Sequence, residues 1–539
     1  MIKISSDILR ITSVAVILIA AVIILPAYIF AQNLTVDYST YLGGEWADEA
    51  GGIVAGTDET VYVTGYTESA NFPAENSYQA ANAGSSDAFV TRLSSTGSTI
   101  LYSTYLGGSG ADIALGVAVN TDGSAYIVGY TDSADLPTVS PYQSANTGDE
   151  DAFITRLSTS GTALLYSTYL GGAGSDYGRD ITIDTAGIIY ITGDTSSTDF
   201  PTVNPYQSSN AGGTNDAFVT KFSSDGSALL YSTYLGSSDA GGWGGHDAGY
   251  GIAVDTSGYT YVGGRTYSGD FPTVNPYQST NGGGRSGFVT KFSTSGSTLE
   301  YSTYLSSESN DYISALAIDT AGSAYVAGNT YGYQFPLVNA YQSTLCGGGD
   351  AYVTKFSTSG STLDYSTYLG GSSLYDIAYC VTVDEAGSAY VGGRTSSSDF
   401  PTVNPYQAVY GGSYDVFFTR FSASGSTLEC STYLGGTDSE YAYGITIDTN
   451  GNTYIAGFTE SADFPTTDSY QAANAGDRDA FIAKMFLAYT TPTPDKTPTP
   501  SVTPTPSVTP TPSVTPTPST TPTPSVTPTP STTPTRQYR

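Results

Sequence analysis

The sequence has very few of the residues on which most catalytic sites depend. Its 539 residues include one histidine, three cysteines, two methionines and two tryptophans. An odd and sparse cysteine set is no disulfide framework, and Cys346, Cys380 and Cys430 show no metal-ligand spacing. No segment after residue 33 carries a sustained helical period, which argues against a helical domain.

Positive charge is also scarce. The chain has 17 lysines and arginines against 49 acidic residues, and its formal net charge is −32. Such a surface repels nucleic acid and anionic lipid, so no nucleic-acid partner is expected. The charge suits divalent cations or basic partners, although solubility in a salty or extracellular setting explains it as well.

Internal repetition dominates what the sequence does contain. The string Tyr-Ser-Thr-Tyr-Leu, with Cys for its first Tyr in one copy, recurs every 64 or 65 residues. One spacing of 70 contains an insertion at Ser237 to Gly245. The copies begin at Tyr38, Tyr102, Tyr166, Tyr231, Tyr301, Tyr365 and Cys430. Units at so regular a spacing predict a repeat architecture.

Each unit reads as four short strands separated by turns rich in Gly, Asp and Ser. In the second unit the expected strands are Thr99 to Leu106, Val117 to Val119, Ala125 to Tyr130 and Ala152 to Leu157. Four strands are the content of a propeller blade. The sequence therefore predicts an all-β, seven-bladed β-propeller with four antiparallel strands per blade. A β-solenoid is the alternative, but its coils are usually shorter and lack two tight hairpins per repeat.

The ends of the repeat region predict how the ring closes. The repeats begin with a lone outer strand, Leu34 to Leu42, and finish with a lone third strand, Ala480 to Leu487. Pairing the two completes the last blade of a propeller over residues 34–487 and removes two exposed strand edges. The long loops between second and third strands should pack their Phe and Tyr between blades. The inner strands are expected near Ile53, Val117, Ile181, Ile252, Leu316, Val381 and Ile445.

Several motifs recur in all the units and carry a family resemblance. In the third unit they are Asp199-Phe200-Pro201-Thr202, Pro205-Tyr206-Gln207, Asp216-Ala217-Phe218-Val219-Thr220-Lys221 and Tyr231-Ser232-Thr233-Tyr234-Leu235-Gly236. With these motifs the chain resembles the bacterial and archaeal SBBP repeat, named for seven-bladed β-propellers, over about residues 34–487. The resemblance implies an extracytoplasmic propeller, and it does not imply one established activity.

One recurring position predicts a binding site. An acidic residue stands just before each inner strand, at Asp48, Asp112, Asp176, Asp247, Asp311, Asp376 and Glu440. Ring closure should bring these carboxylates around one channel mouth, on the face with the long loops, where binding usually resides. Because hard cations prefer clustered oxygens, this ring is the candidate ligand site and Ca²⁺ site, and no other cofactor is expected. The alternative is that each carboxylate caps its own turn.

Other notable residues are interpreted as structural. Near the end of the third strand, a basic residue recurs whose stem should cover apolar surface while its head pairs with a carboxylate. These residues are Arg92, Arg156, Lys221, Lys291, Lys355, Arg420 and Lys484. Cys380 and Cys430 replace a repeat Gly and a repeat Tyr and are expected in the core.

No catalytic set stands out in the sequence. His246 lies beside Asp247 and near Trp243 in the insertion of the fourth unit. The insertion offers no nucleophile elbow, so we interpret this histidine as a surface residue. The many acids include no pair singled out for glycoside hydrolysis.

The segments outside the repeats predict export and display. Lys3 and Arg10 precede an apolar run that ends at Ala31. Residues 1–31 fit a signal peptide or, because the run is long enough to span a bilayer, an uncleaved signal anchor. Residues 490–539 repeat Thr-Pro-Thr-Pro-Ser-Val and predict a disordered, extended tail of the kind found in glycosylated stalks.

These features predict a non-enzymatic binding or scaffold module, secreted or displayed at the cell surface. It should recognise protein or carbohydrate through the long-loop face and contact a membrane only through an N-terminal anchor. Nearly identical repeats and a single histidine favour binding over catalysis. The alternatives are a polysaccharide-degrading propeller enzyme and a structural cell-envelope component.

Overall fold

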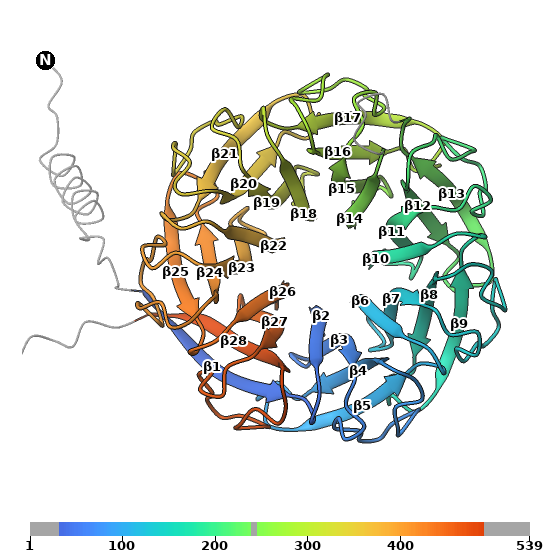
Figure 1. Cartoon of the computed structure of the whole chain (residues 1–539), viewed down its shortest axis with the longest axis horizontal. Helices are drawn as coiled ribbons and strands as arrows, with labels where there is room; N and C mark the ends of the chain where they lie inside the picture. The colour runs from blue at the N-terminus through green and yellow to red at the C-terminus, as the bar shows by residue number, and fades with distance from the viewer. Residues whose placement is uncertain (1–31, 239–244, 490–539) are drawn as a thin grey trace, which may run out of the picture. The chain divides into compact units, whose positions relative to one another are not determined.

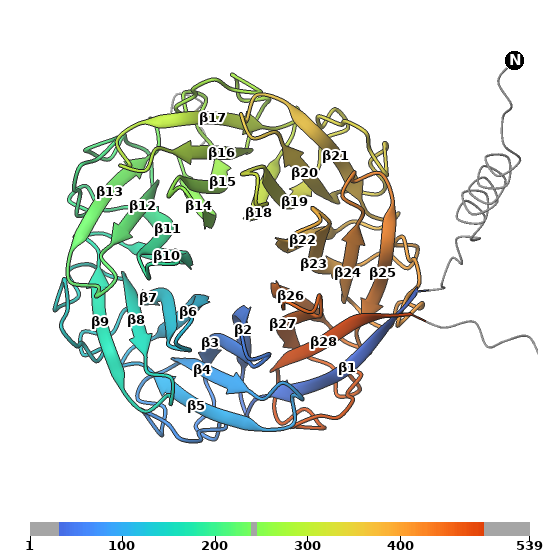
Figure 2. The same cartoon turned by 180° about the vertical axis from the view of Figure 1, so that it is seen from behind.

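The computed structural model describes residues 32–238 and 245–489. They form seven four-stranded antiparallel sheets, the blades, arranged around a central axis (Figure 1 and Figure 2). Trp243, the segment 1–31 and the tail 490–539, with the expectations attached to them, lie outside the described residues. Within the described ranges, no helix is long and apolar enough to cross a membrane.

The blades are numbered in chain order, so that blade 1 contains β2 to β5 and blade 7 contains β26 to β28 with β1. Strand order is the same in every blade, and blades 1 to 6 are each continuous in sequence. The strands nearest the axis are β2 (Asp48–Ala55), β6 (Asp112–Val119), β10 (Asp176–Ile183), β14 (Asp247–Val254), β18 (Asp311–Ile318), β22 (Asp376–Val383) and β26 (Glu440–Ile447). The second strands are β3 (Val61–Thr67), β7 (Ala125–Thr131), β11 (Ile189–Thr195), β15 (Thr260–Thr266), β19 (Ala324–Thr330), β23 (Ala389–Thr395) and β27 (Thr453–Thr459). These ranges confirm the predicted inner strands.

The outer half of each blade is also a hairpin, except in blade 7. The third strands are β4 (Asp87–Leu93), β8 (Asp151–Leu157), β12 (Asp216–Phe222), β16 (Ser286–Phe292), β20 (Asp350–Phe356), β24 (Asp415–Phe421) and β28 (Asp479–Tyr489). The outer strands are β5 (Ile100–Leu106), β9 (Leu164–Leu170), β13 (Leu229–Leu235), β17 (Leu299–Leu305), β21 (Leu363–Leu369), β25 (Leu428–Leu434) and β1 (Gln32–Leu42).

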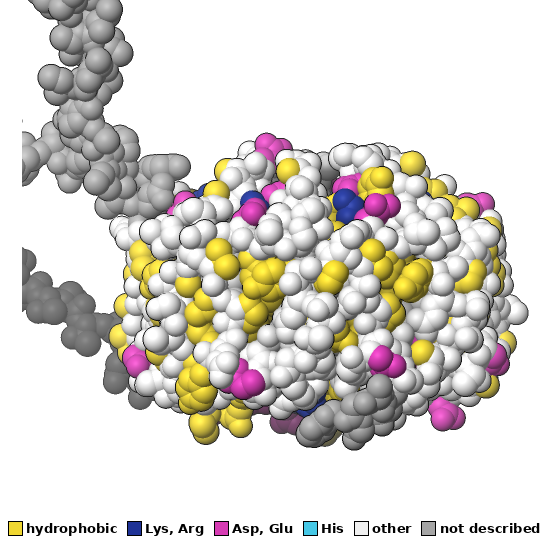
Figure 3. Space-filling view, turned by 90° about the horizontal axis from the view of Figure 1, so that it is seen from above, with side chains coloured by type: hydrophobic (Ala, Val, Ile, Leu, Met, Phe, Trp, Pro, Cys, Tyr) yellow, Lys and Arg dark blue, Asp and Glu magenta, His cyan; other side chains and the backbone are white. Residues whose placement is uncertain are grey.

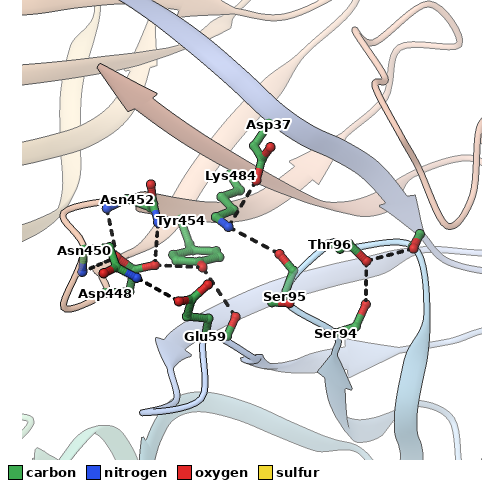
Figure 4. A network of polar contacts seen from close by, with 11 residues as sticks. Asp37, Glu59, Ser94, Ser95, Thr96, Asp448, Asn450, Asn452, Tyr454 and Lys484 are labelled. Atoms are coloured by element: carbon green, nitrogen blue, oxygen red, sulfur yellow. Dashed lines mark hydrogen bonds and ion pairs between the residues drawn. The ribbon is translucent and has the colours of Figure 1, made fainter. Parts of the chain in front are cut away.

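The ring is closed by strands from the two ends of the repeat region, as predicted. β1 pairs antiparallel with β28, from Gln32 opposite Tyr489 to Leu42 opposite Ala480. Lys484 of β28 reinforces this closure, with its Nζ 3.1 Å from a carboxylate oxygen of Asp37 on β1 (Figure 4). The same ammonium group donates to a backbone carbonyl of blade 1 at 3.3 Å, so it links blade 7 to its neighbour.

The hydrophobic core lies between blades. One cluster joins Val90 and Tyr102 of blade 1 to Ile127 and Phe153 of blade 2, because a blade must bury its faces against its neighbours. The approach is close at Gly161, where a Cβ would lie 2.2 Å from the Tyr102 ring and where φ is +73°. Cys380 and Cys430 are buried, which confirms their predicted place in the core.

The long loops cover the outer wall of the ring. In blade 2, Val139 pairs with Ser167 and Gln143 with Tyr169 of the outer strand. This pairing protects an edge that would otherwise be exposed. The middle of each loop therefore runs over the outer wall, while the two ends of the loop stay on the face expected for binding.

The loop phenylalanines, and Leu136 in blade 2, are buried as expected; the Phe200 ring, for example, lies 4.6 Å from that of Phe218. The loop tyrosines were expected to avoid water as well, and this is wrong for several of them: Tyr142 packs against Phe222 of the next blade but is 37% exposed.

The recurring basic residue of the third strand has the structural role predicted for it. In blade 1 the Arg92 guanidinium lies 4.9 Å from the centroid of the Tyr62 ring and 2.6 Å from a carboxylate oxygen of Asp58. All seven positions stack in this way on a tyrosine of the second strand.

Candidate functional site

The acidic residues that open the seven inner strands are fully buried. In blade 2, Asp112 accepts hydrogen bonds from the backbone N–H of Gly108 at 2.8 Å and from Ser133 Oγ at 2.9 Å. An equivalent backbone bond of 2.6–3.0 Å recurs at Asp48, Asp176, Asp247, Asp311, Asp376 and Glu440. Each carboxylate therefore holds the turn through which the chain enters its blade.

The structure corrects the expected position of this ring. Side chains alternate along a strand, and in β6 the channel is lined by Ile113 and Leu115 while Asp112 is buried behind the wall. Burial raises the pKa of Asp48 from 3.8 to about 7. Among residues 32–238 and 245–489, no three His, Cys, Asp or Glu side chains converge as a metal site requires. Binding of a ligand or Ca²⁺ by this ring stays a prediction.

The central channel encloses about 710 Å³ and is lined mainly by the inner strands (Figure 1). We call the end at which these strands begin the channel mouth. Tyrosines from most blades line the wall, at Tyr66, Tyr130, Tyr250, Tyr312, Tyr331, Tyr379 and Tyr443. Aromatic faces with a polar tip suit the binding of an organic ligand.

Arginines gather at the same mouth. All five basic residues of the propeller outside the third-strand position lie there, namely Arg179, Arg265, Arg285, Arg394 and Arg478. Each stands on an inner strand, at the end of a second strand or just before a third strand, and these points share one face of the ring. A guanidinium cluster in a chain of net charge −32 marks this mouth as unlike the rest of the surface.

Three of these arginines alternate with four tyrosines in a continuous series across blades 3, 4 and 5. Each guanidinium carbon lies 4.7–5.7 Å from the ring centroids on both sides of it. The series, called the Tyr–Arg ladder below, runs Tyr177, Arg179, Tyr250, Arg265, Tyr267, Arg285 and Tyr312. Stacking stabilises each cation through the ring face.

A separate stack lies on blades 6 and 7. The Arg394 guanidinium is 4.1 Å from the centroid of Tyr441 and 4.6 Å from that of Tyr414. It faces the same mouth, because Arg394 pairs across the sheet with Ile377 of the channel wall.

Carboxylates partner only some of these arginines. Arg179 forms an ion pair with Asp194, and Arg478 forms one with Glu49. In the part of the chain that the structure describes, the other three have no ion pair. These are Arg265, Arg285 and Arg394. Among residues 32–238 and 245–489, the positive charge of these three arginines on blades 4 and 6 therefore has no ion-pair partner.

His246 lies next to the Tyr–Arg ladder. Its Nε2 is 3.3 Å from a guanidinium nitrogen of Arg265, and its ring centroid is 5.5 Å from that of Tyr267. Burial lowers the pKa of His246, which favours the neutral imidazole. The residue is half-buried, so it is less exposed than the free surface position expected for it.

The residues that line the mouth were not predicted from the sequence, because they occupy repeat positions whose residue type does not recur. The residue after each inner-strand acid differs from blade to blade: Glu49, Ile113, Tyr177, Ala248, Tyr312, Ile377 and Tyr441. So does the residue before each third strand: Ser86, Glu150, Asn215, Arg285, Gly349, Tyr414 and Arg478. The sequence signal that could have identified these residues is their variation at fixed positions of repeats that are otherwise nearly identical.

Comparisons with known proteins agree with this fold. The sequence profile of the beta-propeller repeat SBBP matches residues 101–137, 165–201, 230–272, 300–336, 364–401 and 431–465. No curated protein sequence matches the chain.

Among solved structures, the chain is similar to the WD40 beta propeller domain of Doa1. The identity is 10% and the TM-score 0.43, over 84% of this chain and 97% of that chain. It is also similar to the polysaccharide lyase Uly1, with 10% identity and a TM-score of 0.43 over 85% and 98% of the two chains. A protein of unknown function from Dyadobacter fermentans is similar at 9% identity and a TM-score of 0.41, over 85% and 100%. With its repeat motifs, its profile matches and its seven blades, the chain belongs to the family of SBBP beta-propeller repeat proteins.

Proposed function

We propose that this protein is a non-enzymatic, extracytoplasmic binding module whose ligand, a protein or a carbohydrate, enters the channel mouth. The observation that carries the proposal is the gathering of tyrosines and arginines at that mouth, on positions that vary between otherwise similar repeats. Binding usually resides where a rigid scaffold presents variable residues. The apolar segment before residue 32 and the Thr/Pro-rich tail support display outside the cytoplasm.

A binding screen tests this proposal. The propeller is applied to a glycan array and to extracellular proteins, and each hit is titrated by calorimetry. Tyr379→Ala and Arg394→Gln should weaken binding about tenfold or more, as loss of a buried aromatic or charged contact does at binding sites. The matched control is Arg156→Gln, which removes the same Arg–Tyr stack at the opposite end of a blade and should leave binding unchanged.

Two outcomes would contradict the proposal. Equal loss of binding in the control and the mouth variants would place the ligand elsewhere or show general unfolding, and the melting temperature of each variant separates those cases. Turnover of a bound ligand to a product, abolished by His246→Ala, would show that the protein is an enzyme. The position of His246 beside Arg265 is the observation that favours this second candidate.

A further inference from the structure

We propose that the ligand of the channel mouth is an acidic polysaccharide whose uronate carboxylates are bound by Arg285, Arg394 and the Tyr–Arg ladder. The inference rests on the proposed function and names its ligand class. It follows from the guanidinium groups that have no carboxylate partner, from the way they are stacked, and from the charges on the two sides of the mouth.

Stacking orients these guanidinium groups for an incoming carboxylate. The Arg285 carbon lies 4.7 Å from the ring centroid of Tyr267 and 5.7 Å from that of Tyr312, and the side chain is exposed. One terminal nitrogen of Arg285 already donates to the Tyr312 hydroxyl. A planar guanidinium that stacks through its face keeps its other in-plane N–H groups for hydrogen bonds. Its fixed fork matches both oxygens of a carboxylate, which makes a bidentate, charge-assisted pair.

Arg394 supplies a second, independent cation. It stacks on Tyr441 and Tyr414, and its buried Nε has no hydrogen-bond partner among the residues that the structure describes. Buried polar groups are normally paired, so the Arg394 guanidinium is short of acceptors. Its Nε is itself buried, and a ligand would contact the part of this half-buried side chain that remains exposed. Because Arg394 lies two blades from Arg285 around the ring, a ligand that satisfies both must carry more than one anionic group.

The alternation of cation and aromatic ring favours a sugar polymer over other polyanions. A uronate unit offers an apolar ring face and a carboxylate side by side. The mouth offers guanidinium groups beside channel-lining tyrosines such as Tyr331, which belongs to blade 5 between Arg285 and Arg394. Tyr rings are well suited to pack against such faces while their hydroxyls hydrogen-bond. An acidic peptide would use the charges and leave the rings without a partner.

Charge on the opposite side of the mouth orients the ligand. Glu68, Asp132 and Glu150 belong to blades 1 and 2, where Glu49 is also paired with Arg478, whereas the corresponding mouth positions of blades 4 to 6 carry no acid. Like charges repel a polyanion, so an acidic polysaccharide is held against blades 4 to 6.

Calorimetric titration of the propeller with a galacturonic acid oligomer tests the inference. The comparison ligands are a galactose oligomer of equal length, which lacks carboxylates, and polyglutamate, which lacks sugar rings. The acidic oligomer should bind saturably and more weakly as salt increases. Arg285→Gln and Arg394→Gln should each lower its affinity about tenfold, as loss of a charge-assisted pair does. Arg285→Lys should recover only part of the loss, because lysine lacks the fork. Arg156→Gln should bind like the parent.

Three results would overturn the inference. Equal affinity for the galactose oligomer would show that carboxylates are not recognised, yet the channel mouth would remain a binding site if Tyr379→Ala weakened that binding. Tighter binding of polyglutamate would make the ligand an acidic peptide. No binding of any of these probes, while the array yields another ligand for the mouth, would refute the ligand class and leave the proposed function standing.

Discussion

Two natural substitutions in blade 4 show what the buried carboxylate that opens the third strand of the other blades does. In blade 4 this residue is Ser286, and the position after the outer strand is Ser306 where other blades mostly have glycine. Ser306 Oγ accepts hydrogen bonds from Gln278 Nε2 at 2.9 Å and from the backbone N–H of Gly282 at 3.0 Å. In blade 2, Asp151 accepts the equivalent pair of bonds. In blade 4 the Ser306 hydroxyl thus accepts the two hydrogen bonds that the carboxylate at the start of the third strand accepts in blade 2.

The two positions should therefore be coupled. Asp151→Ser removes the carboxylate that accepts hydrogen bonds from the Thr147 backbone N–H and from Gln143; a hydrogen bond to a charged group contributes about 1.5–3 kcal/mol. Gly171→Ser places a Cβ 2.4 Å from an Asp151 oxygen and should destabilise by a similar amount. The double variant Asp151→Ser/Gly171→Ser reproduces the serine pair of blade 4. Its free energy of unfolding, measured by urea denaturation, should therefore fall by less than the sum of the two single losses. Additive losses would contradict this explanation.

Buried carboxylates predict that stability falls as pH rises. Burial raises the pKa of Asp48, Asp247, Asp350 and Glu440 to about 7. Because the pKa of each of these groups is higher in the folded state than in the unfolded state, the folded state binds more protons. The stability that these groups contribute is complete below about pH 4 and is lost as the pH rises to about 7. Hydrogen bonds lower the pKa of the exposed Asp225 to about 2. Aspartates of this kind stabilise the fold when ionised, so their contribution to stability is lost as the pH falls toward 2.

The melting temperature should accordingly be higher at pH 5 than at pH 8. Asp48→Asn keeps an acceptor oxygen and removes one titrating group, so it should narrow the difference between the two pH values. A parent protein that melts at the same or a higher temperature at pH 8 would show that these carboxylates remain ionised when buried.

At the scale of strands, closure depends on β1. It contributes Tyr38, Tyr41 and Leu42 to the core, all at most 1% exposed. Deleting residues 34–43 should strip the outer strand from blade 7. Since losing one large buried side chain typically costs about 3–5 kcal/mol, thermal unfolding should occur at a markedly lower temperature. The control deletion of residues 490–539 should leave the melting temperature unchanged, and equal melting of the two variants would contradict closure by β1.

Strand positions were predictable from the sequence because each strand repeats with its flanking turns. Within a strand, the face of a residue was harder to predict. Asp112 was correctly placed at the start of an inner strand, but its side chain turns away from the channel. The path of the long loops was missed as well, since single pairs such as Val139 with Ser167 leave no strand pattern in the sequence. The Tyr–Arg ladder joins residues of different repeats, and no one repeat contains its pattern.

At the scale of the whole molecule, charge is unevenly placed. Figure 3 shows the ring from one side, with acidic and basic side chains mainly near the two rims and uncharged side chains between them. With a net charge of −32, the propeller should stay soluble and avoid anionic surfaces. This distribution suits a protein exposed to the medium.

Export is the prediction that belongs to the full chain. Expressed with residues 1–31, the propeller should be recovered outside the cytosol when cells are fractionated. N-terminal sequencing of the exported protein distinguishes cleavage near Ala31 from a retained anchor. Cytosolic protein that still begins with Met1 would refute the assignment of this segment.

The closure of the ring has a mechanical consequence. Gln32 and Tyr489 face each other at one end of the β1–β28 ladder, so the chain enters and leaves the propeller at the same point of the rim (Figure 2). Tension between the flanking segments would pull the two strands apart from that end and load their hydrogen bonds one pair at a time. Ladders loaded in sequence yield at far lower force than ladders sheared along their length. Tension across the two ends of the propeller should therefore open it by peeling β1 from β28.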